Sequence, residues 1–125
     1  MLQMNSEVSI IDNSGGLVGN CITILGGKRF GTIGDKITIS LRKVAKGKHS
    51  NQRKISVGKV YRALIVQTKK ERRRKDGSVI KFSRNGVILL NAQDHPIGTR
   101  IKSSIPKELK HSSHLKAISL GSNLI

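Results

Sequence analysis

Hydrophobic residues occur at every second position along much of this chain, which is the period of a β-strand. The alternation is clearest where Ile37, Ile39 and Leu41 are interleaved with polar residues. Runs of similar composition, separated by turn residues, occur at 8–11, 20–25, 36–41, 60–68, 78–82 and 87–90. The run at 60–68 is apolar on both faces in its second half. About six short strands joined by Gly-rich turns are typical of a mainly β protein with a small closed or nearly closed barrel.

Turn residues divide these runs in a consistent way. Asp12 to Gly16 form a turn cluster, and residues 26–35 form a Gly-rich loop. A polar, basic loop covers residues 45–56. Asn85 and Gly86 supply the positive φ angles of a tight turn, and they predict a hairpin between the last two runs.

The last quarter of the chain has a helical rather than a strand pattern. Pro106 suits the first turn of a helix, where its missing N–H is not needed, and Glu108 follows near the positive end of the helix dipole. Ser112 or Ser113 is suited to cap a second short helix. The sequence therefore predicts two short helices at about 105–120, after a barrel at about 1–104, within a single domain of 125 residues.

Composition adds a large excess of positive charge to this picture. The chain has 24 Lys and Arg against 7 Asp and Glu, a net charge of +17, and only 2% aromatic residues. Ile, Val and Leu must therefore fill the core. The positive charges repel one another unless a polyanion neutralises them, and such small domains usually bind nucleic acid or an anionic membrane.

Several functional classes lack support in the sequence. Cys21 is the single cysteine, which excludes an internal disulfide, and its strand-like surroundings predict a buried, inert thiol. His111 and His114 stand three apart without other ligands, so no metal or other cofactor is expected. The spacing of Gly26 to Gly31 resembles a phosphate-binding loop, but Thr32 follows where that motif needs Lys. No acid–base pair or nucleophilic triad is visible, and we expect no enzymatic activity.

Membrane association is also not expected. No stretch reaches the roughly 20 apolar residues of a membrane span, and the first residues do not resemble a targeting segment. Binding to a membrane surface would favour a basic amphipathic helix with aromatic residues, which is not visible.

The basic residues are concentrated in particular loops. The first 27 residues contain no Lys or Arg, whereas six of the seven residues from Lys69 to Lys75 are basic. One interpretation is a solvated, charged loop. We favour a phosphate-binding surface, because clustered cations repel at close range and a second basic loop, at 45–56, leads into the same strand. The absence of a recognition-helix or zinc-finger pattern favours folded RNA, bound through shape and backbone charge.

An ordered set of segments resembles one known family. The segments IDNSGG, CITILGG, IGDKITISLRK, ALIVQTKK, DGSVIKFSRNGVILLN, HPIGTRI and KELK…LKAISL follow the order of the universal large-subunit ribosomal protein numbered fourteen. The resemblance extends from Leu2 to Leu120. One departure is Lys102–Ser103–Ser104, which replaces an aromatic-Gly-Pro run of the family.

The resemblance implies a five-stranded β-barrel with a projecting ribbon and short C-terminal helices. It implies a structural constituent of the large ribosomal subunit that binds large-subunit RNA and helps form a bridge to small-subunit RNA. The implied protein partners are the large-subunit protein numbered nineteen, through strand pairing, and a ribosome silencing factor. Family positions on the bridging face match Thr99, Arg100 and Lys116.

The cations predicted to contact ribosomal RNA come from the Gly-rich loop, the two basic loops and the strands beside them. They are Lys28, Arg29, Lys46, Lys48, Arg53, Lys54, Lys69, Lys70, Arg72, Arg73, Arg74, Lys75, Lys81 and Arg84. The alternative function is a free RNA-binding or regulatory protein outside the ribosome. The divergence from bacterial relatives and the many Ile, Lys, Asn and Ser residues favour an organelle-encoded protein of the mitochondrial ribosome, in the matrix, with a plastid or bacterial origin as alternatives.

Overall fold

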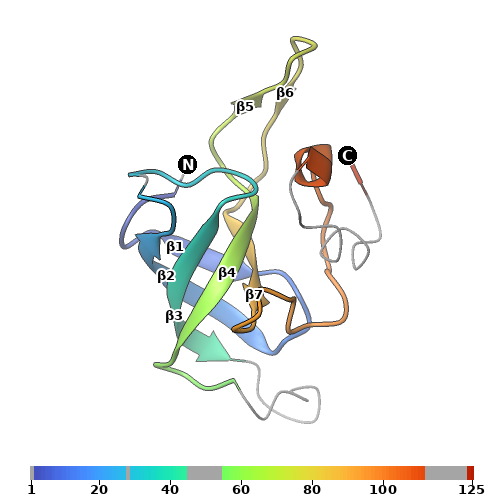
Figure 1. Cartoon of the computed structure of the whole chain (residues 1–125). Helices are drawn as coiled ribbons and strands as arrows, with labels where there is room; N and C mark the ends of the chain where they lie inside the picture. Colours follow the sequence, from blue (N-terminus) through green and yellow to red (C-terminus); the bar gives the residue numbers. More distant parts are fainter. Residues whose placement is uncertain (1, 28, 45–54, 112–123) are drawn as a thin grey trace.

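A closed five-stranded β-barrel forms the centre of the computed structural model, which describes residues 2–27, 29–44, 55–111 and 124–125 (Figure 1). In their order around the barrel, the strands are β1 (Glu7–Ile10), β2 (Gly16–Ile24), β3 (Lys36–Val44), β4 (Val60–Gln67) and β7 (Gly86–Leu90). The prediction of a small, mainly β barrel is confirmed.

The barrel closes through its one parallel pair of strands. β1 runs parallel to β7, with Ser9 opposite Gly86 and Ile10 opposite Val87, while the other neighbouring strands are antiparallel. The Ile11 N–H donates to the Val87 carbonyl at 3.0 Å. Closure gives each of the five strands two neighbours, which removes the open edges of a flat sheet.

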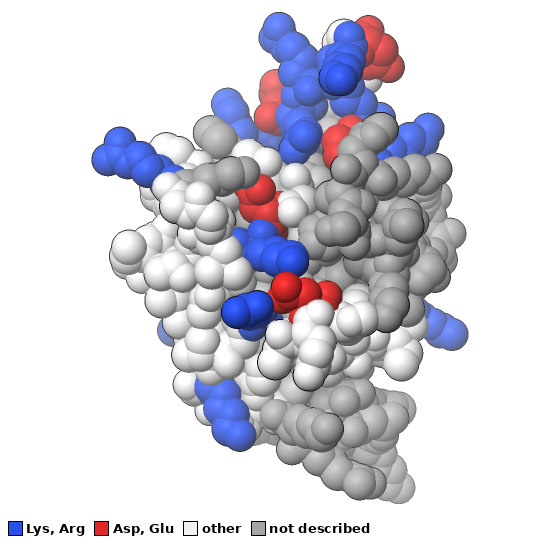
Figure 2. Space-filling model, in the orientation of Figure 1, with Lys and Arg blue, Asp and Glu red and all other residues white. Residues whose placement is uncertain are grey.

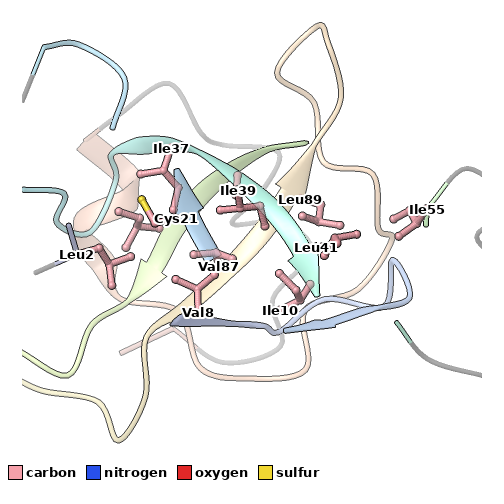
Figure 3. Close-up of a cluster of buried hydrophobic side chains, with 12 residues drawn as sticks. Leu2, Val8, Ile10, Cys21, Ile37, Ile39, Leu41, Ile55, Val87 and Leu89 are labelled. Carbon is pink, nitrogen blue, oxygen red and sulfur yellow. The ribbon is translucent and has the colours of Figure 1, made fainter. Parts of the chain in front are cut away.

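The barrel interior is filled by aliphatic side chains, as the low aromatic content requires (Figure 3). Ile37, Ile39 and Leu41, which alternate along β3, are all buried, so the period of two in the sequence marks the inward face. Cys21 lies among these residues, and burial raises the pKa of its thiol. The prediction of a buried thiol is confirmed.

A second apolar cluster lies outside the barrel, where the segment after β7 covers β4 and β7. Leu64 and Val66 of β4 and Ile88 of β7 face this cluster and are fully buried. Residues that follow β7 complete it, namely Ile101, Ile105 and Leu109. The double coverage explains why the second half of the 60–68 run is apolar on both faces.

The predicted hairpin at Asn85 and Gly86 is wrong. Residues 78–82 contribute only the short strand β6 (Val79–Ile80), which pairs with β5 (Arg72–Arg73) and not with β7. Neither Asn85 nor Gly86 has a positive φ. A Cβ on Gly86 would lie 2.8 Å from the Gln67 side-chain oxygen, so glycine serves close packing of β7 against β4.

The helical part of the C-terminal segment begins after Pro106, as the sequence predicted. A single 3₁₀ helix among the described residues, η1 (Lys107–His111), starts directly after Pro106 and has Glu108 in its first turn. The predicted second helix falls on residues 112–120, which lie outside the described residues.

Candidate nucleic-acid interface

The basic segment after β4 forms a two-stranded ribbon that projects from the barrel (Figure 1). The charge run alone suggested a loop from Lys69 to Gly77, whereas the family resemblance implied a projecting ribbon. The segment contains β5, which pairs with β6 in the register Arg72 to Ile80 and Arg73 to Val79. Because neighbouring residues of a strand point to opposite faces, the ribbon divides its cations between two faces.

The inner face of the ribbon contacts the rest of the protein. The Arg72 guanidinium donates to the Ile33 carbonyl at 3.2 Å and to the Thr32 hydroxyl at 3.3 Å. Arg74 forms a salt bridge with Glu108 of η1, in which both side chains are mostly buried, and it also donates to the Ile125 carbonyl at 2.8 Å. These two arginines therefore hold the ribbon against the Gly-rich loop and the C-terminal segment.

The outer face of the ribbon exposes its remaining cations to solvent. Arg73, Lys75 and Lys81 are all exposed, and Val79 beside Arg73 is 50% exposed. Lys69 and Lys70 are exposed at the base of the ribbon. Figure 2 shows Lys and Arg side chains gathered over the projecting ribbon. This face presents several positive charges within a few residues.

The tip of the ribbon is a structured turn. The Asp76 carboxylate accepts hydrogen bonds from the Ser78 N–H at 3.0 Å and the Ser78 hydroxyl at 2.6 Å, and these bonds lower the pKa of Asp76. The Arg74 N–H donates to the Ser78 carbonyl at 2.8 Å. The Asp76–Gly77 pair thus ends the ribbon and keeps the two short strands in register.

A second surface is built by the loop containing Thr99 and Arg100, both of which are exposed. The Asn13 side-chain oxygen accepts from the backbone N–H groups of Thr99 at 2.7 Å and Arg100 at 3.0 Å. The Asn13 side-chain amide donates to the Thr99 hydroxyl at 2.9 Å, and the Asn13 N–H donates to the Arg100 carbonyl at 3.0 Å. Four hydrogen bonds from one residue fix this loop.

The residues around Asn13 anchor it to the barrel. The buried Asp12 carboxylate accepts from the Leu89 N–H of β7 at 3.1 Å and from Ser14, and burial raises its pKa despite these bonds. A Cβ on Gly98 would lie 2.8 Å from the Asn13 side-chain oxygen, so the close approach of the loop requires glycine. Sequence reasoning treated residues 12–16 only as a turn and missed this role, although the polar pair Asp12–Asn13 directly after an apolar strand was a signal.

A third group of charges, also missed, lies on the barrel wall. Lys36 of β3 and Arg62 of β4 both form salt bridges with Asp94, at 3.0 and 3.2 Å. These contacts, that to Lys36 first, lower the pKa of Asp94. Asp94 lies in the turn before Pro96 with a φ of 63°, and its carboxylate contacts the barrel strands β3 and β4 through these salt bridges.

The structure brings together the predicted cations of the ribbon and its base. Arg84 belongs to this group, because its side chain donates to Gln67 at 3.4 Å at the end of β4. Arg29 is exposed in the Gly-rich loop, beside an open groove lined partly by Met4, Ile22 and Phe30. The Arg72 contacts with Thr32 and Ile33 connect this loop to the ribbon.

Six predicted site residues lie outside the described residues: Lys28, Lys46, Lys48, Arg53, Lys54 and Lys116.

Metal binding and membrane crossing have no structural counterpart among the described residues. In the part of the chain that the structure describes, no cluster of three or more His, Cys, Asp or Glu residues could hold a metal ion. Within the same ranges, no helix has the length and apolar character needed to cross a membrane.

The fold and these surfaces define a small, basic β-barrel protein with a projecting cation-rich ribbon. The family model described as Ribosomal protein L14p/L23e matches residues 1–125, and the chain belongs to this family. It is therefore a ribosomal protein, from a family of structural constituents rather than enzymes.

Proposed function

We propose that this protein binds large-subunit ribosomal RNA through the outer face of the β5–β6 ribbon. The observation that carries the proposal is that neighbouring arginines of the ribbon differ in their contacts. Arg72 and Arg74 are engaged by protein oxygens, whereas Arg73, Lys75 and Lys81 are exposed and form no salt bridge with other described residues. Cations held on a fixed ribbon, in no salt bridge with another described residue, suit phosphate oxygens.

Binding of this kind reads the shape and charge of folded RNA rather than its base sequence. The protein has only three aromatic residues, two Phe and one Tyr, so base stacking has few candidates. Each phosphate contact releases a condensed counterion, which makes the affinity depend on salt. The cations of residues 45–54 and Lys28 are proposed to add further phosphate contacts.

The test compares two neighbouring arginines of the ribbon. Arg73→Gln should reduce the slope of log affinity against log salt by about one unit for deproteinised large-subunit RNA, because it removes one phosphate contact. Arg72→Gln removes the same charge from the inner face and should change the slope less. Filter binding at several salt concentrations measures both, with circular dichroism to check folding. Equal slopes for Arg73→Gln and the wild type would refute the role of the outer face.

Incorporation into the ribosome separates this proposal from the alternative of a free RNA-binding protein. We expect the chain to sediment with large subunits in about one copy per subunit, and to remain there after a moderate salt wash. A chain found at the top of the gradient would favour the alternative.

The loop of Thr99 and Arg100 is proposed to face the small subunit. The resemblance implies a bridge to small-subunit RNA at this position, together with Lys116, and docking of a ribosome silencing factor on the same surface. What supports the proposal is that Arg100 is exposed on a loop that Asn13 holds rigidly. Arg100→Glu should weaken subunit joining while sparing incorporation into large subunits, and normal joining would contradict the bridge.

Strand pairing with the large-subunit protein numbered nineteen is proposed for the ribbon. The five barrel strands already have two neighbours each, whereas among the described residues β5 and β6 pair only with each other. Cross-linking from cysteines introduced at Glu71 and Lys81 should capture that neighbour in intact subunits. Cross-links only to other ribosomal proteins would contradict strand pairing at the ribbon.

A mitochondrial ribosome, with the gene in the organelle, is the proposed location. The divergence from bacterial relatives and the many Ile, Lys, Asn and Ser residues support it. Labelling of the protein should resist inhibitors of cytosolic translation, and labelling that stops under them would indicate a nuclear gene.

A further inference from the structure

The Asn13 side chain has only one possible orientation at the loop of Thr99 and Arg100. Two backbone N–H groups, from Thr99 and Arg100, point at the same side-chain atom at 2.7 and 3.0 Å. An amide nitrogen cannot accept these bonds, so this atom must be the oxygen. The nitrogen of the amide consequently faces the Thr99 hydroxyl, at 2.9 Å.

This orientation determines whether the Thr99 hydroxyl donates to Asn13 or accepts from it. The Asn13 nitrogen is a donor only, so the Thr99 oxygen must accept from it. A hydroxyl has one hydrogen, which then has to point away from Asn13. Within the described part of the chain, this hydrogen is donated to no other group, and Thr99 is exposed. The Thr99 hydroxyl is therefore presented to solvent as a donor.

The neighbouring Arg100 guanidinium is also a donor and carries no acceptor. Its backbone is held on both sides by Asn13, through the N–H at 3.0 Å and the carbonyl at 3.0 Å. The loop thus presents two adjacent donor groups on a backbone that has little freedom to rearrange.

We infer that Asn13 is a positioning residue that turns the hydrogen of the Thr99 hydroxyl outward, so that the Thr99–Arg100 loop presents two adjacent donors to a phosphate of RNA. This inference rests on the proposed bridge and specifies its chemistry. A phosphate suits both groups, because its negative charge strengthens each hydrogen bond and its oxygens can accept from the hydroxyl and the guanidinium together.

Substitution of Asn13 by Asp reverses the direction of the side-chain hydrogen bond with Thr99 while keeping the shape of the side chain. In Asn13→Asp, one carboxylate oxygen still accepts from the two backbone N–H groups, and the other takes the place of the amide nitrogen. Thr99 would then donate inward to the carboxylate and would present only lone pairs to solvent. Thr99→Val removes the hydroxyl with little change in shape, and Thr99→Ser retains it as the matched control.

Subunit joining measures the effect, with large subunits purified from cells that carry each variant and a fixed concentration series of small subunits. Thr99→Val and Asn13→Asp should each weaken joining by about tenfold, the value of one hydrogen bond to a charged acceptor. Thr99→Ser should join normally. One copy of the variant chain per large subunit, by mass spectrometry, shows that each variant has folded and assembled.

The double variant Asn13→Asp with Thr99→Val distinguishes an effect through the Thr99 hydroxyl from a direct effect of the added negative charge. If Asn13 acts through Thr99, the double variant should be no weaker than either single one, because the hydroxyl that the introduced carboxylate would redirect is absent. A loss that adds to that of Thr99→Val would mean that the new negative charge acts directly, and would overturn the inference.

The Arg100→Glu variant separates this inference from the bridge itself. Weak joining with Arg100→Glu, together with normal joining for Thr99→Val and Asn13→Asp, would refute the role of Asn13 and of the Thr99 donor while leaving the bridge in place. Normal joining with all three variants would refute both.

Discussion

Asp12 shows what a single buried carboxylate contributes to this barrel. It is only 2% exposed, and it connects the end of β1 to β7 through the Leu89 N–H while bonding Ser14. Burial disfavours its charged form more than the hydrogen bonds and the nearby Lys102 favour it, so its pKa is raised. The same residue supports its neighbour Asn13, which holds the loop of Thr99 and Arg100.

The raised pKa predicts how stability depends on pH. In the unfolded chain Asp12 titrates near its usual value, about 3.9, and in the folded protein it titrates at a higher pH. Between these two values the folded state holds the proton more tightly, so the contribution of Asp12 to the free energy of unfolding falls as pH rises through this window.

Asp12→Asn removes the titrating group, so comparison with the wild type gives the contribution of Asp12 to the free energy of unfolding. We expect the wild type to lose stability relative to Asp12→Asn as pH rises from about 3.5 towards neutrality, with the difference constant once the folded-state pKa is passed. Urea denaturation at a series of pH values gives this difference. A difference that is constant over the whole range would show that Asp12 titrates alike in both states.

At the scale of elements, the strands with a one-sided pattern were predictable from the sequence. The period of two in β3 identified both the strand and its buried face, because burial on one face imposes that period. Runs buried on both faces, such as β4 and β7, could be recognised as strands, but not assigned neighbours. The parallel pairing of β1 with β7 joins residues far apart in sequence and leaves no local signal.

Local turn chemistry gave the wrong partner for β6, since Asn85–Gly86 resembles a hairpin turn but serves close packing against Gln67. The cationic segment was found from its charge. Which face of the ribbon contacts the protein could not be predicted, because the contact of Arg74 is with Glu108, 34 positions away in the sequence. Likewise, the contact of Asn13 with a loop 86 residues away could not be read from the turn cluster in which it lies.

The salt bridge between Arg74 and Glu108 belongs to this scale, because it connects the ribbon to η1. The side chains are 26% and 15% exposed, so the pair is shielded from solvent more than a surface salt bridge. Glu108→Gln should loosen the ribbon and increase hydrogen exchange of the Arg74 amide about fivefold, corresponding to about 1 kcal/mol of local stability.

Lys107→Gln is the matched control for that measurement, because Lys107 is the exposed neighbour on the same 3₁₀ helix. It should leave ribbon exchange unchanged. If both variants exchange alike, the orientation of the ribbon is set by its own backbone and not by Arg74.

For the whole molecule, the decisive quantity is the net charge of +17 on a domain of 125 residues. The first 27 residues hold only two acidic charges and no Lys or Arg, so the cations are crowded into the remaining chain. Three salt bridges among the described residues engage Lys36, Arg62 and Arg74. Their acidic partners are already counted in the net charge, so these contacts do not reduce the excess of 17 positive charges. Such self-repulsion destabilises the folded state until counter-charges approach.

The isolated protein should therefore become more stable as salt screens this repulsion. We expect its Tm to rise by several degrees between about 20 mM and 300 mM NaCl, because the Debye length falls to less than the spacing of the surface charges. Heparin, a polyanion with no base sequence, should raise Tm at low salt by occupying the cationic surface. The variant Arg73→Gln with Lys75→Gln has fewer repelling charges, so its Tm should depend less on salt and heparin than that of the wild type. A wild-type Tm that stays constant across the salt series would mean that the fold tolerates its charge without a polyanion, and would remove the physical basis for an outer face that requires RNA.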